Sequence, residues 1–207
     1  MSALRGSLTY SRFFVEGEVP DDAHDKFLKA IRKNVLQPLV PEEDTPERTG
    51  WCRMAEPFEL DLSYEDVFWN EYLNLGVRTD RWAIPGPLLK SKVREAEQEL
   101  LKQKGRDRLS RHEKKELKEM TAKQLRRQIA PSTRAVDLSW SMNEGIVRFF
   151  SQSDKRAAFM IDLFEKTFRL KLVAESPYTL ATRLGLSKSQ ELAWEEAEPS
   201  ELVGGAK

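Results

Sequence analysis

The chain has 207 residues, 40% of them apolar, and its 34 Lys and Arg residues balance 34 Asp and Glu residues. This length allows one sizeable hydrophobic core, and the single cysteine, Cys52, excludes an intramolecular disulfide. Because the sequence shows neither a secretory signal nor an apolar run long enough to span a bilayer, we expect a cytoplasmic protein with no membrane partner.

The overall neutrality conceals a strongly uneven distribution of charge along the chain. Residues 81–134 contain 16 Lys and Arg against 7 Asp and Glu, whereas residues 1–80 contain 9 against 16. Residues 135–207 are slightly acidic, with 9 against 11. A basic segment on an acidic body indicates a polyanionic partner.

The N-terminal part of the chain is predicted to form strands around one helix. Aromatic and β-branched residues predict a strand over residues 7–15. A proline and early carboxylates then start a helix over residues 20–34, with apolar residues at helical spacing. After a polar loop at 41–48, the stretches 51–62 and 67–84 are predicted to be extended and to form a hairpin.

Two basic helices follow this sheet-like part. The sequence Pro85-Gly86-Pro87 separates the two parts, and the first helix is expected to end near Gly105. Ser110 and Glu113 match a capping box that opens the second helix, which Pro131 ends. Because the link between them is short, the two helices should form an antiparallel hairpin, each about 27 Å long.

The C-terminal part returns to the sheet. Strands are predicted over residues 134–140 and 145–151, followed by a strongly apolar helix over 153–168 that should lie flat on the sheet. A short strand at 170–173 and a last helix that starts at Ser187 complete the pattern.

These elements predict an α+β protein with a mainly antiparallel sheet, backed by the helices at 20–34 and 153–168, and a projecting basic antiparallel helical hairpin. The expected division is a body made of 1–84 and 135–196, a hairpin subdomain at 85–134 and a flexible tail at 197–207.

Several short phrases stand in a distinctive order along the chain. They are Gly50-Trp51, Ile84-Pro85-Gly86-Pro87, the run from Arg111 to Glu119, Asp137-Leu138-Ser139-Trp140 and the helix at 153–168. Over residues 4–196 they resemble the RdgC family of bacterial recombination-associated proteins. The resemblance implies a nucleoid-associated protein that binds double-stranded DNA without sequence preference, forms a ring-shaped homodimer and restrains RecA-driven recombination.

The chain departs from that family in two places. It stops soon after Trp194, where full-length relatives continue through a segment that helps to build the ring, so we treat it as a short form for which ring closure is an open question. The stretch Pro131-Ser132-Thr133 is shorter and more polar than the apolar hook expected at one dimer contact, which favours weak pairing at that end.

Self-association is instead expected through the apolar helix at 153–168. This helix has more apolar circumference than one sheet contact needs, so Phe159 and Leu163 are candidate dimer-interface residues. The alternative is that the last helix, which carries Leu192 and Trp194, covers the surplus surface.

The hairpin supplies the candidate DNA contacts, since phosphate binding requires several cations and no reading of base edges. We expect charge reversal at Arg126 and Arg127 to weaken DNA binding and to leave the fold intact. Two alternatives remain: an ordinary solvated helix face, and a non-enzymatic interaction module whose hairpin docks an acidic protein. The candidates are Arg106, Arg108, Arg111, Lys114, Lys115, Lys118, Lys123, Arg126, Arg127 and Arg134.

The sequence gives only weak indications of a metal site, a nucleophile or a nuclease site. Carboxylates beside His24 fit the start of a helix better than a metal site, and Cys52 lacks a partner at motif spacing. Among the tryptophans, Trp82 at the hairpin root is the candidate for contact with a partner. We therefore predict no catalytic residue, metal, cofactor or small-molecule substrate. A nuclease would need converging carboxylates, whereas the acids here are expected to alternate along an extended segment: Glu59, Asp61, Glu65 and Asp66.

Overall fold

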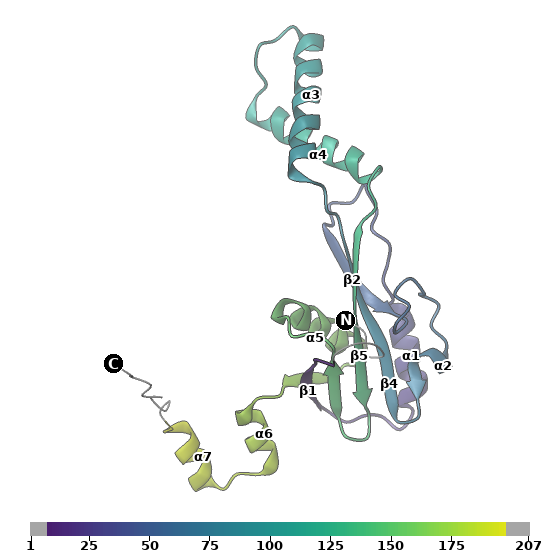
Figure 1. Cartoon of the computed structure of the whole chain (residues 1–207), viewed down its shortest axis with the longest axis vertical. Coiled ribbons are helices and arrows are strands. Elements are labelled where there is room, and N and C mark those ends of the chain that lie inside the picture. The colour runs from purple at the N-terminus through teal and green to yellow at the C-terminus, as the bar shows by residue number, and fades with distance from the viewer. Residues whose placement is uncertain (1–7, 198–207) are drawn as a thin grey trace.

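One curled antiparallel sheet joins both ends of the chain in the computed structural model, which describes residues 8–197 (Figure 1). The strand order is β2-β4-β5-β6-β1-β7, with β3 paired to β4, and every pair is antiparallel. The predicted sheet is thereby confirmed, while the tail predicted at 197–207 lies, after its first residue, outside the described residues. The strands are β1 (Ser11–Glu16), β2 (Glu47–Cys52), β3 (Phe68–Trp69), β4 (Tyr72–Arg81), β5 (Ser132–Ser141), β6 (Ile146–Phe149) and β7 (Lys171–Ala174).

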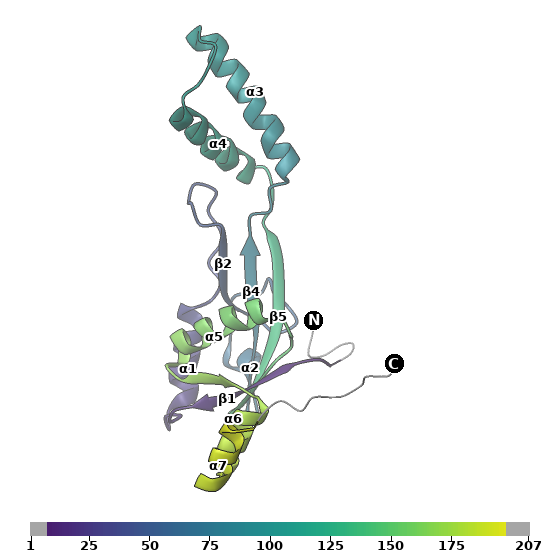
Figure 2. The same ribbon diagram turned by 90° about the vertical axis from the view of Figure 1, so that its left-hand side faces the viewer.

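The helices occupy three regions of the molecule. Helices α1 and α5 pack on the sheet, α3 and α4 project beyond the ends of β4 and β5, and α6 and α7 lie at the opposite end (Figures 1 and 2). The predicted helical hairpin is thus present. The helices are α1 (Ala23–Lys33), α2 (Tyr64–Val67), α3 (Gly86–Lys104), α4 (Arg111–Arg126), α5 (Asp154–Phe168), α6 (Pro177–Leu184) and α7 (Lys188–Glu195).

The core lies between the sheet and helices α1 and α5. Side chains alternate between the two faces of a strand, so every second residue of β4 and β5 faces these helices. Trp140 of β5 packs against Phe164 and Phe168 of α5, with ring centroids 5.2 and 5.4 Å apart. Phe168 also contacts Phe27 of α1 at 5.0 Å. This cluster holds both helices against the sheet through large buried aromatic surfaces.

The opposite face of β4 carries a buried ion pair. Arg78 donates two hydrogen bonds to the carboxylate of Asp80, at 2.9 and 2.6 Å, and a third to the carbonyl oxygen of Pro57. Thr133 of β5 donates to the same carboxylate at 2.8 Å. The charge of Arg78 is therefore neutralised inside the fold, beneath the loop that follows β2.

Helix α5 has less spare apolar surface than the sequence analysis expects. Leu163 is only 7% exposed and belongs to the core, and Phe159 is half-buried. The sheet and α1 cover much of the apolar side of α5. Leu163 is consequently a poor candidate for a dimer interface. The last helix leaves Leu192 and Trp194 59% and 42% exposed.

Two short helices interrupt segments for which the sequence analysis predicted none. Helix α2 starts at Ser63, whose hydroxyl accepts a hydrogen bond from the N–H of Asp66 while the Asp66 carboxylate accepts one from the N–H of Ser63. Helix α6 starts in the same way at Ser176. Both are local capping boxes, which stabilise even a short turn of helix.

Candidate nucleic-acid interface

The hairpin is built by local signals at each helix end. Helix α3 begins directly after Pro85 and ends at Gly105, whose φ of +58° places it in the left-handed region that glycine adopts without strain. Helix α4 begins with the predicted capping box, in which Ser110 and Glu113 exchange hydrogen bonds of 2.9 and 3.2 Å. Local sequence signals therefore fix the start of both helices and the end of α3, whereas α4 ends at Arg126, before the Pro131 at which the sequence analysis ended it.

A narrow contact holds α3 against α4. Within the hairpin the buried side chains are those of Leu109, Thr121 and Leu125, and no residue of α3 is fully buried. Ion pairs cross between the helices: Lys114 lies 2.9 Å from Glu97, and the Glu113 carboxylate accepts from Lys104 at 2.9 Å. With so little apolar contact, these polar links help to define how the two helices pair.

Glu113 is the central group of this arrangement. Hydrogen bonds from the backbone N–H of Ser110 and from Lys104 lower the pKa of Glu113 to about 2, from an ordinary 4.5. A lowered pKa means that the stabilising contribution of the carboxylate is complete above pH 4.5 and is lost as the pH falls towards 2.

We predict that Glu113→Gln loosens the start of α4 without unfolding the body. The variant removes the charge that pairs with Lys104 and keeps only part of the cap. Hydrogen–deuterium exchange should increase at the amides of residues 105–114 and stay unchanged in β4 and β5. Glu119→Gln, an exposed position on the same helix, is the control. Unchanged exchange at the start of α4 would show that Glu113 does not hold this end of the hairpin.

Three of the predicted DNA-contact residues bind the protein's own acidic loop. At the end of α4 nearest the sheet, Lys123 lies 3.5 Å from Asp44 and Arg127 lies 2.9 Å from Glu42. Arg126 donates a hydrogen bond of 2.8 Å to the carbonyl oxygen of Glu43. These contacts join the loop before β2 to the hairpin. Charge reversal at Arg126 and Arg127 would break the contacts of these two residues with the loop, so it would change more than the electrostatic potential that the sequence analysis expected it to alter.

Lys114 and Arg106 are also occupied, by Glu97 at 2.9 Å and by Glu113 at 3.6 Å. Four other cations of the hairpin, in contrast, have no strong partner among the described residues. Arg108, Arg111 and Lys118 are exposed and form no ion pair with any residue between 8 and 197. Lys115 has a single contact of 3.9 Å to Glu119, both exposed, a geometry that contributes little.

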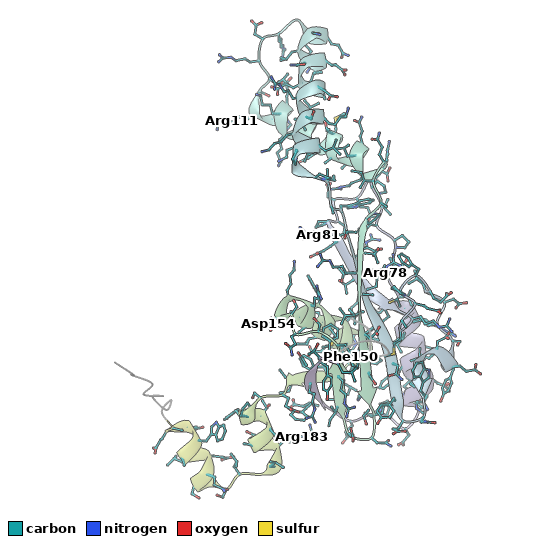
Figure 3. All side chains as sticks on the ribbon, in the orientation of Figure 1. Arg78, Arg81, Arg111, Phe150, Asp154 and Arg183 are labelled. Carbon is teal, nitrogen blue, oxygen red and sulfur yellow. The ribbon has the colours of Figure 1, made fainter. Side chains whose placement is uncertain are left out.

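We call Arg108, Arg111, Lys115 and Lys118 the outer cations. The last three are spaced by four and three residues, so they share one face of α4. Figure 3 labels Arg111 at the start of this helix, far from the sheet. Cations at a helix N-terminus oppose the positive end of the helix dipole, and a bound anion relieves that repulsion.

The tenth predicted contact, Arg134, belongs to β5 and not to the hairpin helices. It lines a groove where the hairpin joins the sheet. The groove has a volume of about 480 Å³ and lies between the ends of β4 and β5, the start of α5 and the segment after β4. We call it the root groove. Its lining includes Arg81, Trp82, Arg134, Lys155 and Arg156. No sequence pattern indicates Lys155 and Arg156 as part of this site, because they come from a helix that only the fold brings to this place.

Catalytic and metal chemistry receive no support from the acidic residues. In residues 8–197 no group of three or more His, Cys, Asp or Glu side chains could hold a metal ion. Asp66 caps α2 and pairs with Arg53, so the acids near it do not form the alternating row that the sequence analysis describes. His24 packs against Phe68, with ring centroids 4.6 Å apart. Burial raises the pKa of Cys52 to about 12, so this thiol is not a ready nucleophile.

The tryptophans divide between core and surface. Trp51 and Trp140 are fully buried, whereas Trp69 is 43% exposed and donates a hydrogen bond to the carbonyl oxygen of Glu65. Trp82 is half-buried in the root groove, which agrees with its predicted place at the hairpin root.

The described helices include none that is both long and apolar enough to cross a membrane. Comparison with known proteins finds neither a family model nor a curated protein that matches the chain.

Proposed function

We propose that this chain binds double-stranded DNA without sequence preference and, in doing so, limits the access of recombination proteins to DNA. The observation that carries the proposal is the division of the hairpin's cations. The acidic loop binds Lys123, Arg126 and Arg127 at the end of α4, while the outer cations have no strong partner within the described chain.

An unneutralised row of cations on one helix face suits a phosphate backbone. Duplex DNA carries one negative charge per about 1.7 Å of its axis, and each neutralised phosphate releases counterions that favour binding. Arg111 and Lys118, two turns apart on α4, are separated by about 10 Å along the helix axis. That spacing lets neighbouring side chains reach several phosphates of one groove edge.

The side chains of the outer cations do not favour base reading. Specific readout depends on bidentate donors and acceptors held against base edges, which usually includes Asn, Gln or a supported Arg. The outer cations are exposed, and among residues 8–197 their one ion pair is the long contact between Lys115 and Glu119. Contacts of this kind position a protein on the backbone and carry no sequence information. The resemblance to RdgC proteins supports the same function and the restraint of recombination.

The proposal predicts that affinity does not depend on the sequence of the duplex. Two unrelated blunt duplexes of about 20 base pairs, measured at the same salt concentration, should give dissociation constants within about threefold of each other. At physiological salt both constants should be micromolar or weaker. Fluorescence anisotropy measures both. A difference above about tenfold, or 1.4 kcal/mol, would mean that base edges are read and would contradict the proposal.

A further inference from the structure

The root groove exists because α5 covers only part of the sheet face on which it packs. Alternate residues of β4 share that face, so Val77, Thr79 and Arg81 follow one another from the core outwards. Val77 is paired with Val136 and Thr79 with Arg134 across β4 and β5. Beyond the start of α5 no helix of residues 8–197 covers this face, and the groove opens there.

The groove collects positive charge that the protein does not neutralise. Four cations line it and one acid, Glu47, accompanies them; the cations are Arg81, Arg134, Lys155 and Arg156. Within residues 8–197 none of the four forms an ion pair. Arg78, on the other face of the same strand, shows the contrast, because Asp80 binds it through two hydrogen bonds. Gathered cations repel one another, and an anion in the groove removes that repulsion.

The start of α5 adds to this field. Ser153, which precedes the helix, lines the groove together with the first-turn residues Lys155 and Arg156. The 15 residues of α5 direct the positive end of their dipole to the same side. Figure 3 labels Arg81 and Asp154 on the two sides of this region. Asp154 is exposed and is not part of the lining, so it opposes the field only from the rim.

Aromatic side chains complete the lining. Trp82 and Phe159 line the groove beside the cations, and the ammonium of Lys155 lies 5.5 Å from the Phe159 ring. The indole N–H of Trp82 is buried and has no acceptor among the described residues. Native proteins rarely leave a buried donor without a hydrogen-bond partner. A volume of about 480 Å³ is also in the range of small-ligand sites.

Cations combined with aromatic surfaces match the two parts of a nucleotide, its phosphate and its base. We infer that the root groove binds one unpaired nucleotide, with the phosphate at the four cations and the base at Trp82 and Phe159. The inference rests on the proposed function in one respect: a strand end or gap in DNA held by the hairpin would supply that nucleotide. A free nucleotide has the same chemistry, so the experiment separates the two sources.

The test measures binding of fluorescein-labelled tetrathymidylate, a short single strand. Wild-type protein should bind it, and Lys155→Gln combined with Arg156→Gln should weaken that binding by about tenfold or more. The matched control is Lys166→Gln with Lys171→Gln, which removes the same charge from exposed positions outside the lining and should change affinity less than about twofold. Circular dichroism checks that every variant is folded.

Competition identifies the source of the ligand. If thymidine monophosphate displaces the probe as well as unlabelled tetrathymidylate does, the groove takes a free nucleotide; if only the oligonucleotide competes, it takes a strand. Inorganic phosphate that competes as strongly as thymidine monophosphate would overturn the role of the aromatic residues and, with it, the assignment.

The inference and the proposed function fail separately. Charge reversal at Arg111 and Lys118 should weaken duplex binding and leave tetrathymidylate binding within about threefold of wild type. Absence of saturable tetrathymidylate binding at millimolar protein, or an equal loss in the groove variant and its control, would overturn the inference even where duplex binding persists.

Discussion

Reversing two outer cations, Arg111→Glu with Lys118→Glu, should lower affinity for duplex DNA by about a hundredfold at 50 mM salt. The change removes two phosphate contacts and places two carboxylates beside the phosphates, which costs roughly tenfold per site. Both side chains are exposed and make no contact that holds α4 in place, so the melting temperature should stay within about 2 °C of wild type.

The matched control reverses the same charge at the other end of the helix. Lys123→Glu with Arg127→Glu breaks the contacts to Asp44 and Glu42, so it should release the acidic loop and affect DNA binding much less. Anisotropy titrations of both double variants separate local contact from total charge. Equal losses would show that only the net charge of the hairpin matters, and no loss in the outer variant would favour an ordinary solvated face.

Gly50→Ala should be the most destabilising single substitution of a small residue in the body. A Cβ at this position would overlap the backbone N and Cα of Leu36 and lie 2.9 Å from the carbonyl carbon of Val35. This approach is fixed by backbone hydrogen bonds: the N–H of Leu36 donates to Trp51 and the N–H of Trp51 donates to Asn34, both at 3.0 Å. Neither β2 nor the segment at 34–36 can shift without breaking these bonds.

We expect Gly50→Ala to cost about 2–3 kcal/mol and to lower the melting temperature by about 5–10 °C. Gly86→Ala is the control, because a Cβ there meets no atom within 4 Å and the residue lies at the start of α3. Its melting temperature should equal that of wild type or rise slightly. If the melting temperature of Gly50→Ala equals that of wild type, residues 35 and 36 do not approach β2 as closely as described.

The parts of the fold that short-range patterns specify could be predicted from the sequence. The glycine at 105 marked the end of α3, and the capping box at Ser110 and Glu113 marked the start of α4; the structure places both ends there. The apolar spacing of α5 likewise predicted a helix on the sheet. The capping boxes of α2 and α6 carry the same kind of signal, in segments that the sequence analysis treated as extended or left unassigned.

The candidate site was predicted only in part, because its properties depend on contacts between distant residues. No local pattern shows that Arg127 meets Glu42, 85 positions earlier, or that Arg126 meets the backbone of Glu43. The same holds for Lys155, which joins Arg134 only after β5, β6 and α5 have packed. The sequence alone identifies a set of candidate cations, and the fold determines which of them remain unpaired and able to bind phosphate.

The salt dependence of duplex affinity tests the central claim most directly. If each of the four outer cations neutralises one phosphate, a plot of log association constant against log salt concentration should have a slope of about −3.6. Reversing Arg111 and Lys118 removes two of these contacts, so the slope of the variant should be about −1.8. An association constant that is independent of salt, or equal slopes for wild type and this variant, would contradict binding through the outer cations.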